Sequence, residues 1–431
     1  MKYFLPKGTF DILPEEPKQQ ESWKESARWH HLEKVAKELA RDYCYREIRT
    51  PIFEQSDLFI RGVGESSDIV SKEMYLFQDK GGRSMSLRPE GTASVMRAFA
   101  EAQLQQLGSI HKFFYLGPFF RYDRPQAGRY RQFHQFGVEA IGVAGPESDF
   151  EAIEMLYEFY RRLKLQDLQV MINTLGDKEC REKYQASLLN FLKPHFNRLS
   201  EESKLRFSKN PLRILDTKDP EEKHLLQQAP SILDFLSQDD KTSFESLCFL
   251  LKSEGIPFKV TPTLVRGLDY YNQVVFELTS NVLGAQNTIG AGGRYDGLLP
   301  SIGGADLPCI GFSTGLERIL QTMEGQGLSF PEARGPTVVI LPLGEKPKEP
   351  AFKLLYALRH AHISAEMIAA KKVQKGIQQA SKLKGRYVIV IGLDELEKER
   401  VEIKEMDNRT SQSVSLSQVV EYLKERNEHG L

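Results

Sequence analysis

Two runs of sequence decide the fold class: HKFFYLGPFFRYD at 111–123 and RQFHQFGVEAIG at 131–142. Both are rich in aromatic and alternating apolar residues, which favour β-strands. The PQAGRY between them supplies proline and glycine for a loop. The two runs therefore predict an antiparallel hairpin with a long tip.

The second run is expected to line a pocket. Because side chains alternate along a strand, Phe133, Gln135, Gly137 and Glu139 share one face. His134, Phe136, Val138 and Ala140 share the other face and read as its core side. An amide and a carboxylate with a glycine between them are unusual on a core face, so we expect the first face to border a cavity.

Segments on either side of the hairpin are predicted with less detail. Residues 22–41 read as an amphipathic helix, with Leu32, Val35, Ala36 and Leu39 at helical spacing. Residues 178–255 are charged and broken by prolines, and they predict a helical insertion. Strand-like patterns return in TPTLVRGLDYYNQVVFELTS at 261–280 and near Gly290, and GLERILQTME predicts a helix after GFST.

The sequence changes character beyond EGQGLSFPEARGP at 324–336. There VVILPL, AEMI, YVIVIG and VEIKEM alternate with helix-like segments, which is typical of a small α/β domain with a mainly parallel sheet. We therefore expect a catalytic domain at 1–325, which includes the insertion, a linker at 326–335 and an α/β domain at 336–431.

Composition limits the class of protein. A chain of 431 residues is too long for one ordinary core, and a net charge of -1 argues against non-specific coating of nucleic acid. The four cysteines form no CxxC pair, so neither a disulfide framework nor a structural zinc site is expected. The start of the chain does not resemble a signal peptide, and no segment approaches the roughly 20 apolar residues of a membrane span. We expect a cytoplasmic protein.

Three arginines stand in apolar or glycine-rich surroundings: Arg121 in FFRYDRP, Arg266 in LVRGLDYY and Arg318 in GLERIL. A buried guanidinium needs an anion, because an unpaired buried charge is costly. Since the chain has no GxxxxGK[ST] phosphate loop, polyphosphate is a candidate partner for the three together. The alternative is three structural ion pairs with acids that are near in sequence, namely Asp123, Asp269 and Glu317.

Shorter motifs allow more than one interpretation. GFSTG at 311–315 matches the GxSxG turn of serine hydrolases, but every later histidine lies beyond the linker, which disfavours a hydrolase. GAGGRYDG at 290–297 fits a tight turn or a cofactor loop equally well. In LRPEGTA, Glu90 and Thr92 offer acceptors for a substrate ammonium, or they cap a helix N-terminus; both interpretations can hold together.

Longer segments resemble a known family. LRPEGTASVMRAF at 87–99, the hairpin at 117–142 and GFSTGLER at 311–318 resemble motif 2 with its surroundings, and motif 3, of class II aminoacyl-tRNA synthetases. RGLDYYN at 266–272 and AGGRYDGL at 291–298 resemble the two signature segments of histidyl-tRNA synthetases. The opening KGTFDILP is similar to that family's start, with Lys7 where arginine is common. The resemblance runs from about residue 5 to the C-terminus.

This resemblance implies an α+β catalytic domain on an antiparallel sheet, a helical insertion and a C-terminal anticodon-binding α/β domain. It also implies a homodimer, with residues 43–62 similar to the motif 1 dimer element. The implied activity is histidine–tRNA ligation: ATP with Mg²⁺ activates L-histidine to the adenylate, and histidine then passes to the 3′ end of tRNA(His). No dedicated protein site for a metal is expected, because Mg²⁺ would neutralise the β and γ oxygens of ATP.

The resemblance also assigns roles to residues. Arg266 matches the catalytic arginine aimed at the α-phosphate. Arg121 and Arg318 match the ATP-binding arginines. Arg121 is assigned a catalytic role as well, and both Arg121 and Arg266 are assigned to the histidine site. The histidine-binding positions matched are, for the amino group, Glu90, Thr92 and Gln135 and, for the imidazole, Glu139 and Tyr271, with Tyr270 and Tyr295 close by. Arg124 and Gln126 lie in the loop that approaches the tRNA acceptor end.

Three alternative functions explain only part of the sequence. A histidine-sensing regulatory relative would share the core, but such relatives lack the anticodon domain or degrade RGLDYY. A class II synthetase for proline, threonine or glycine is disfavoured by RGLDYY and GGRYDGL. A pure RNA-binding module leaves the embedded arginines and acids unexplained.

A local basic run marks the C-terminal domain. The stretch between Glu366 and Asp394 contains no acid, but it holds Lys371, Lys372 and Lys375 and three further cations. A solvated helix with its lysines outward is the ordinary interpretation. In a domain that resembles an anticodon-binding module, we expect Lys371, Lys372 and Lys375 to contact tRNA phosphates instead.

Overall fold

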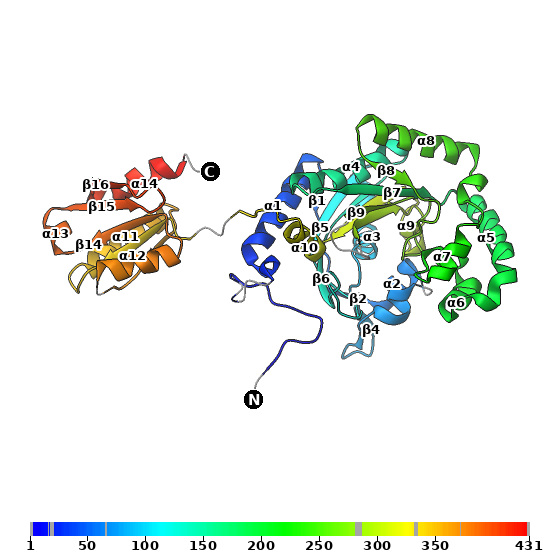
Figure 1. The fold of residues 1–431 in the computed structure, drawn as a ribbon, viewed down its shortest axis with the longest axis horizontal. Coiled ribbons are helices and arrows are strands. Elements are labelled where there is room, and N and C mark those ends of the chain that lie inside the picture. The colour runs from blue at the N-terminus through cyan, green and yellow to red at the C-terminus, as the bar shows by residue number, and fades with distance from the viewer. Residues whose placement is uncertain are drawn as a thin grey trace. The chain divides into compact units, whose positions relative to one another are not determined.

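A computed structural model divides the chain into two compact units, Met1–Pro331 and Glu332–Leu431 (Figure 1). It describes residues 3–15, 17, 21–64, 67–280, 287–331, 335–370 and 372–428. Each unit has its own hydrophobic core, and each is described by itself.

The larger unit is built on the predicted hairpin. Strands β5 (His111–Phe120) and β6 (Gln132–Ile141) pair antiparallel, with Tyr115 opposite Gly137 and Phe113 opposite Glu139. They belong to an eight-stranded sheet of order β1-β5-β6-β11-β10-β9-β7-β8. Only the edge pairs β1–β5 and β7–β8 of that order are parallel. The expected antiparallel sheet is therefore confirmed. The remaining strands are β1 (Arg46–Glu47), β7 (Leu168–Thr174), β8 (Phe258–Val260), β9 (Val274–Ser280), β10 (Thr288–Arg294) and β11 (Cys309–Gly315).

One face of this sheet is covered by helices. Phe136, Val138 and Ala140 of β6 are buried there, as the alternation predicts. Phe136 packs on Phe159 and Phe312, with ring centroids 5.1 and 5.9 Å apart. The covering helices are α1 (Ser26–Asp42), α4 (Pro146–Arg162) and α10 (Leu316–Gly325), and α1 confirms the helix expected at 22–41.

The other face of the sheet carries smaller elements. Helices α3 (Thr92–Glu101) and α9 (Leu298–Ser301) pack on it. A separate three-stranded sheet of order β2-β4-β3 lies beside α2 (Ser56–Val63); its strands are β2 (Phe53–Gln55), β3 (Leu76–Gln78) and β4 (Ser84–Leu87).

The insertion is helical throughout, as expected. It contains α5 (Lys178–Leu192), α6 (Glu201–Lys209), α7 (Pro220–Leu226) and α8 (Gln238–Ser253), joined by short 3₁₀ turns. Figure 1 shows α5, α6 and α7 grouped at one end of the larger unit.

The strand expected across 261–280 is only partly correct. Residues 274–280 form β9, but residues 261–273 form a loop with no strand. Pro262 cannot donate to a sheet ladder, and Arg266, Tyr270 and Tyr271 line a cavity instead of pairing in a strand.

The smaller unit has a sheet of order β13-β12-β14-β15-β16. Strands β12, β13 and β14 are parallel, whereas β14–β15 and β15–β16 are antiparallel. The sheet is therefore mixed, and the expectation of a mainly parallel sheet was wrong. Parallel neighbours need a long crossover connection, and the connections from β14 to β15 and from β15 to β16 are too short to provide one. Its strands are β12 (Val338–Pro342), β13 (Ala365–Met367), β14 (Tyr387–Ile391), β15 (Arg400–Glu405) and β16 (Ser411–Ser415).

Helices cover both faces of this smaller sheet. Helices α11 (Lys348–His360) and α14 (Val419–Glu428) pack on the face with Val338 and Ile340. Helix α12 (Val373–Lys382) packs on the face with Val339 and Leu341, and α13 (Leu393–Glu397) follows β14. Among the described residues of either unit, no helix is both long enough and apolar enough to cross a bilayer.

Phe136→Ala should destabilise the larger unit. Phe136 is fully buried between two other rings, so its truncation should lower the free energy of unfolding by about 3–5 kcal/mol. Both tryptophans, Trp23 and Trp29, lie in the same core, so their fluorescence during urea unfolding measures this unit. Phe249→Ala is the control, because Phe249 is 70% exposed; equal effects of the two changes would contradict the assignment of this core.

Candidate active site

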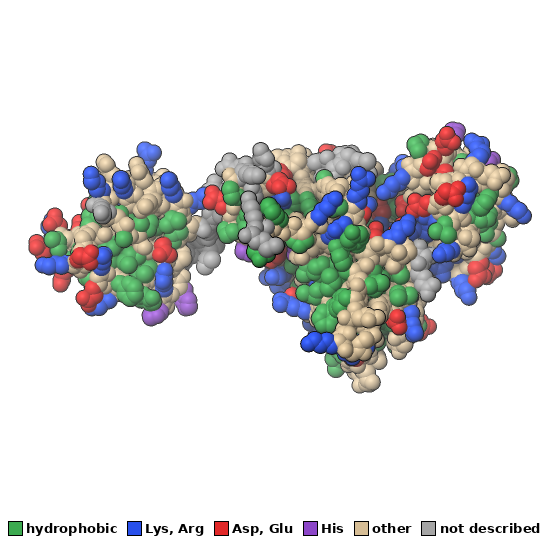
Figure 2. All heavy atoms as spheres, turned by 90° about the horizontal axis from the view of Figure 1, so that it is seen from below, with side chains coloured by type: hydrophobic (Ala, Val, Ile, Leu, Met, Phe, Trp, Pro, Cys, Tyr) green, Lys and Arg blue, Asp and Glu red, His purple; other side chains and the backbone are tan. Residues whose placement is uncertain are grey.

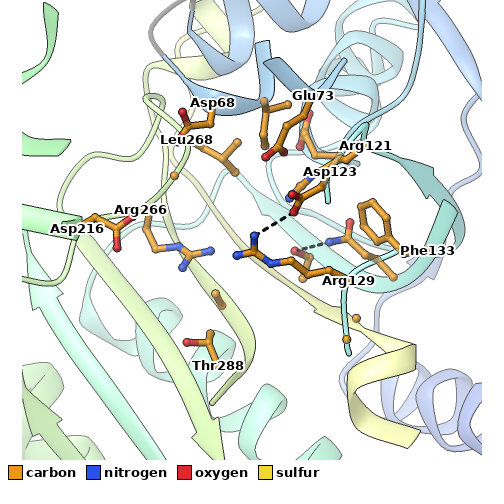
Figure 3. Close-up of a pocket in the computed structure, with 18 of the residues that line it drawn as sticks. Asp68, Glu73, Arg121, Asp123, Arg129, Phe133, Asp216, Arg266, Leu268 and Thr288 are labelled. Atoms are coloured by element: carbon orange, nitrogen blue, oxygen red, sulfur yellow. Dashed lines mark hydrogen bonds and ion pairs between the residues drawn. The ribbon is translucent and has the colours of Figure 1, made fainter. Parts of the chain in front are cut away.

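A cavity of about 640 Å³ opens on the sheet face that carries no large helix. Its wall is formed by β5, β6, β10 and β11, by the 261–273 loop and by the insertion around 200–219. The volume lies in the usual range of small-molecule sites. Figure 3 shows side chains from β6, β10, the 261–273 loop and the insertion converging on it.

Four arginines meet at one end of the cavity. Arg121, Arg266 and Arg318, the three singled out from the sequence, all line it, and Arg129 from the hairpin tip joins them. In Figure 3 the guanidinium groups of Arg266 and Arg129 point toward each other. Burial lowers the pKa of Arg318, and the nearby charges of Arg129 and Arg121 lower it further. Like charges brought together in this way favour a polyanionic ligand.

The acids nearest in sequence have other partners. Asp123 pairs with Arg129 at 3.0 Å, and Glu317 bonds to His134 Nδ1 at 2.9 Å. Asp269 accepts a hydrogen bond from Asn210 Nδ2 at 3.0 Å. Arg121 donates from Nε to the Pro89 carbonyl, and Arg318 donates to the carbonyls of Gly128 and Thr288. Main-chain oxygens therefore help to hold two of the three arginines in place.

Arg266 has an acidic partner that sequence reasoning missed. Its guanidinium pairs with Glu277 of β9, and Thr288 Oγ1 donates to the same carboxylate at 2.7 Å. Burial lowers the pKa of Arg266, but the Glu277 carboxylate, together with Tyr271 and Tyr270, outweighs burial and raises this pKa above the ordinary value. The signal was present, because Glu277 stands alone in the apolar strand VVFELTS. Arg129 was missed because the glycine-rich tip reads only as a loop.

The LRPEGTA segment both caps a helix and lines the cavity. The Glu90 carboxylate accepts the backbone N–H groups of Thr92 and Ala93, at 2.7 and 2.9 Å, and so caps α3. The Thr92 hydroxyl does not cap; it donates to Glu139 Oε1 at 2.8 Å. Both side chains also line the cavity, so Glu90 caps the helix and forms part of the cavity wall.

Glu139 lies behind the wall of the cavity. It is 1% exposed, and its two oxygens accept hydrogen bonds from Thr92 and Tyr295. Burial raises the pKa of Glu139 to about 8. The predicted face of β6 is therefore polar, as expected, but Glu139 is reached through Thr92 and its neighbours and does not border the open space.

A tyrosine cluster surrounds this carboxylate. The rings of Tyr270, Tyr271 and Tyr295 lie 4.7 to 6.2 Å apart, and Tyr270 and Tyr271 line the cavity. Tyr115 also lines it, although the sequence did not single this residue out. A Cβ on Gly137 would lie 2.3 Å from the Tyr115 ring, so the glycine between Gln135 and Glu139 is explained by the ring opposite it.

Gln135 has one amide atom available. Its Nε2 lies 3.4 Å from Ser313 Oγ. Its Oε1 is buried and, within the described part of the chain, has no hydrogen-bond partner. A buried acceptor without a donor indicates a place where a ligand N–H can bind.

The expected RNA contacts lie on the surface. Arg124 and Gln126 are exposed in the β5–β6 connection, and Lys372 and Lys375 are exposed at the start of α12. Lys371 lies outside the described residues. These positions suit contact with a phosphate backbone as well as simple solvation.

The short motifs GFSTG and GAGGR both lie in strands of the sheet. Ser313 lies inside β11, opposite Ala291 and Gly137, and not on a strand-to-helix turn, so the hydrolase interpretation is wrong. GAGGR is strand β10 and not a tight turn. Its glycines allow close approach: a Cβ on Gly292 would lie 2.2 Å from the Gly311 carbonyl.

The two ends of the cavity have different chemistry. Four guanidinium groups at one end suit phosphate oxygens. A carboxylate, an unpaired amide oxygen and tyrosine hydroxyls at the other end suit an ammonium group and a polar ring. Such a site can hold a polyphosphate next to a small amine and align the two for reaction.

Family models match most of the chain. A model described as histidyl-tRNA synthetase matches residues 11–319, and one described as anticodon binding domain matches residues 337–426. The two matches together span both units.

Curated relatives match over nearly their full length. The histidine–tRNA ligase of Protochlamydia amoebophila is 51% identical over 98% of this chain and 100% of its own, and that of Geobacillus sp. is 45% identical over 99% and 100%. Among solved structures, the apo histidyl-tRNA synthetase of S. aureus has a TM-score of 0.82 at 36% identity, covering 98% of this chain and 99% of its own.

Glu139→Gln should change how stability depends on pH. The folded chain holds the Glu139 proton to about pH 8, whereas the ordinary value is 4.5. Between these values the folded state binds more protons than the unfolded state, so a rise in pH favours unfolding. The free energy of unfolding of the wild type should fall relative to Glu139→Gln by up to about 1.4 kcal/mol per pH unit.

Urea titrations followed by tryptophan fluorescence from pH 5 to pH 8 measure this difference. Glu182→Gln, at a largely exposed site on α5, corrects for the loss of one surface carboxylate. A wild-type to Glu139→Gln difference that stays constant with pH would show that Glu139 ionises in the folded chain as it does in water.

Proposed function

Since this chain belongs to the histidyl-tRNA synthetase family and acts as an ATP-dependent histidine–tRNA ligase, we propose that Arg266 and Arg121 are its catalytic residues. The observation that carries the proposal is the convergence of four arginines on one cavity whose other end is lined by acids and tyrosines. In the proposed reaction, a carboxylate oxygen of histidine attacks the α-phosphorus of ATP. The bond to pyrophosphate breaks and the adenylate forms.

No covalent bond to the protein is needed in this step. The protein aligns two anions that repel each other, and it stabilises the negative charge that builds on the α-phosphate. Arg266 supplies that stabilisation, and Glu277 holds its guanidinium until the phosphate arrives. In the second step, the hydroxyl at the tRNA 3′ end attacks the histidyl carbonyl and AMP leaves.

ATP occupies the arginine end in this proposal. Arg318 and Arg121 bind the phosphates, and Arg129 adds charge to the same end. The Phe133 ring lies 5.2 Å from the Arg121 guanidinium and offers a flat apolar surface to the adenine. The described residues contain no cluster of three or more His, Cys, Asp or Glu side chains that could hold a metal. We therefore propose that Mg²⁺ is carried by the β and γ oxygens of ATP, whose charge it neutralises.

Histidine occupies the other end. Its ammonium group donates to Glu90, Thr92 and the buried Oε1 of Gln135, an acceptor that no other described residue satisfies. Its imidazole binds Glu139 and Tyr271, with Tyr270 and Tyr295 closing the pocket. Thr92 and Tyr295 each donate to one oxygen of Glu139. Because each carboxylate oxygen can accept a second hydrogen bond, the imidazole N–H can bind beside these donors.

The tRNA is proposed to meet the enzyme at two places. Arg124 and Gln126 approach the acceptor end, and Lys372 and Lys375, with Lys371, contact phosphates near the anticodon. A histidine-sensing regulator is disfavoured, since the anticodon-binding match spans residues 337–426 and the RGLDYY segment is intact.

The homodimer and the cellular location are also proposals. Figure 2 shows hydrophobic side chains gathered on one face of the larger unit. Phe53, Leu76 and Phe77 of the three-stranded sheet are 52%, 58% and 41% exposed, and residues 43–62 resemble the motif 1 dimer element. We propose that a second copy covers this sheet, and that the enzyme works in the cytoplasm, where tRNA is charged.

Arg266→Ala should slow adenylate formation by about 10²–10³-fold, the usual cost of one group that stabilises transition-state charge. Histidine and ATP should still bind, with much smaller changes in affinity. Single-turnover adenylate formation and equilibrium binding separate the two effects. Arg198→Ala, at an exposed position of the insertion, is the control. Normal adenylate formation by Arg266→Ala would remove Arg266 from the catalytic machinery.

The double variant Lys372→Ala/Lys375→Ala should weaken tRNA binding and flatten its dependence on salt. Lysines that contact phosphates release counterions, so each lost contact reduces the slope of log affinity against log salt by about 0.7–0.9. Filter binding of tRNA between low and high salt measures the slope. ATP–pyrophosphate exchange, which needs no tRNA, should be unchanged. Lys353→Ala on α11, a largely exposed lysine, is the control, and equal slopes for both variants would mean that the α12 lysines are ordinary surface charge.

A further inference from the structure

The loop at 261–273 carries three proposed active-site residues, Arg266, Tyr270 and Tyr271, but no strand of its own. Its ends are tied to the sheet. Asn173 Nδ2 donates to the carbonyls of Pro262 and Leu264, both at 3.0 Å, and the Asn272 N–H donates to the Arg294 carbonyl at 2.8 Å. The positions of Arg266, Tyr270 and Tyr271 therefore depend on the contacts that hold the middle of the loop.

The middle of the loop is held through Asp269. Its backbone N–H donates to the Val63 carbonyl at 3.1 Å, and Oδ1 accepts from Asn210 Nδ2 of the insertion at 3.0 Å. Gly64 has φ +98°, and a Cβ there would lie 2.4 Å from Asp269 Oδ2. The end of α2 thus leaves room for this one carboxylate, which touches both α2 and the insertion.

Arg213 of the insertion faces the same carboxylate. It lies in the 3₁₀ turn Pro211–Asp216 and is 5% exposed. Nη2 bonds to Asp68 Oδ2 at 3.3 Å, and Nη1 lies 3.9 Å from Asp269 Oδ1. Within the described residues, Nε and Nη1 are buried without a hydrogen-bond partner. A buried charge with unsatisfied N–H groups is costly, so a small closure that brings Nη1 onto Asp269 is favoured.

The same turn also reaches the reaction centre. Asp216, three residues after Arg213, lines the cavity, and Figure 3 shows it next to Arg266. Burial raises the pKa of Asp216, and the charges of Arg213, Arg206 and Arg266 partly oppose this. The insertion turn and the 261–273 loop therefore touch at Asp269 and meet again beside Arg266.

We propose that Arg213 is a positioning residue for adenylate formation: it locks the insertion onto Asp269 and thereby holds Arg266 and the Tyr270–Tyr271 pair in register. This inference rests on the role proposed above for Arg266. ATP contacts assigned to Arg121 and Arg318 lie on the hairpin and on α10, outside the loop, so loss of Arg213 should disturb histidine and the chemical step more than ATP.

The first test is ATP–pyrophosphate exchange by Arg213→Gln in the full-length enzyme. We expect kcat/KM for histidine to fall by roughly 10–100-fold, the scale of a misplaced reacting group, and KM for ATP to change by less than about 3-fold. Arg213→Lys keeps the charge but lacks the planar fork, so it should recover part of the loss. The matched control, Arg198→Gln, makes the same change at an exposed site of the insertion and should behave as the wild type.

The second test asks whether Arg213 acts through Asp269. If it does, Arg213→Gln/Asp269→Asn should be no slower than the worse single variant, because both changes break one contact. Effects that multiply would overturn the proposal, and so would wild-type kinetics in Arg213→Gln or an equal rise in both KM values. If Arg213→Gln is unfolded at the assay temperature, the same double-mutant cycle is measured with Arg213→Lys in its place, alone and combined with Asp269→Asn.

The two proposals fail in different ways. Normal adenylate formation by Arg266→Ala would overturn the catalytic assignment and, with it, this inference. A slow Arg266→Ala together with a wild-type Arg213→Gln would overturn the positioning role of Arg213 alone.

Discussion

The structure depends on keeping several positive charges close together. Arg121, Arg129 and Arg318 lie near enough to lower the pKa of Arg318, and repulsion of this kind would separate them on a mobile chain. Main-chain carbonyls at Pro89, Gly128 and Thr288 hold Arg121 and Arg318, and the Asp123 carboxylate holds Arg129. Thr288 belongs to β10, whereas Pro89 and Gly128 lie in connections beside the sheet. The sheet and these connections together preorganise the charge for a polyphosphate.

The two faces of the sheet differ in chemistry: one is apolar and lies under helices, and the other carries polar side chains. Phe136, Val138 and Ala140 are buried under helices on one face, whereas Gln135 and Glu139 of the same strand point to the other. Glycine supplies the space that the polar face needs, since the Tyr115 ring occupies the volume in which a side chain on Gly137 would lie. On this face, the Tyr115 ring and the Glu139 carboxylate occupy the space that Gly137 and Gly311 leave.

Much of the fold could be predicted, but the connections between distant segments could not. The hairpin, the amphipathic helix α1 and the helical insertion follow from local periodicity. The loop at 261–273 did not, because its apolar and aromatic residues have strand-like composition while its contacts come from β7, α2 and the insertion. The antiparallel pairing of β15 with β14 and β16 was also missed, since strand direction depends on connections that periodicity does not encode.

The sequence by itself determined the family to which the chain's motifs belong. It also singled out residues that we propose carry the chemistry: three embedded arginines and the acids Glu90 and Glu139. Only the tertiary structure decided their partners. It paired Arg266 with Glu277, added Arg129 to the arginine end and placed Glu139 behind Thr92. The physical reason is that hydrophobic periodicity is a local property of the chain, whereas the pairing of buried charges depends on which strands and loops become neighbours after folding.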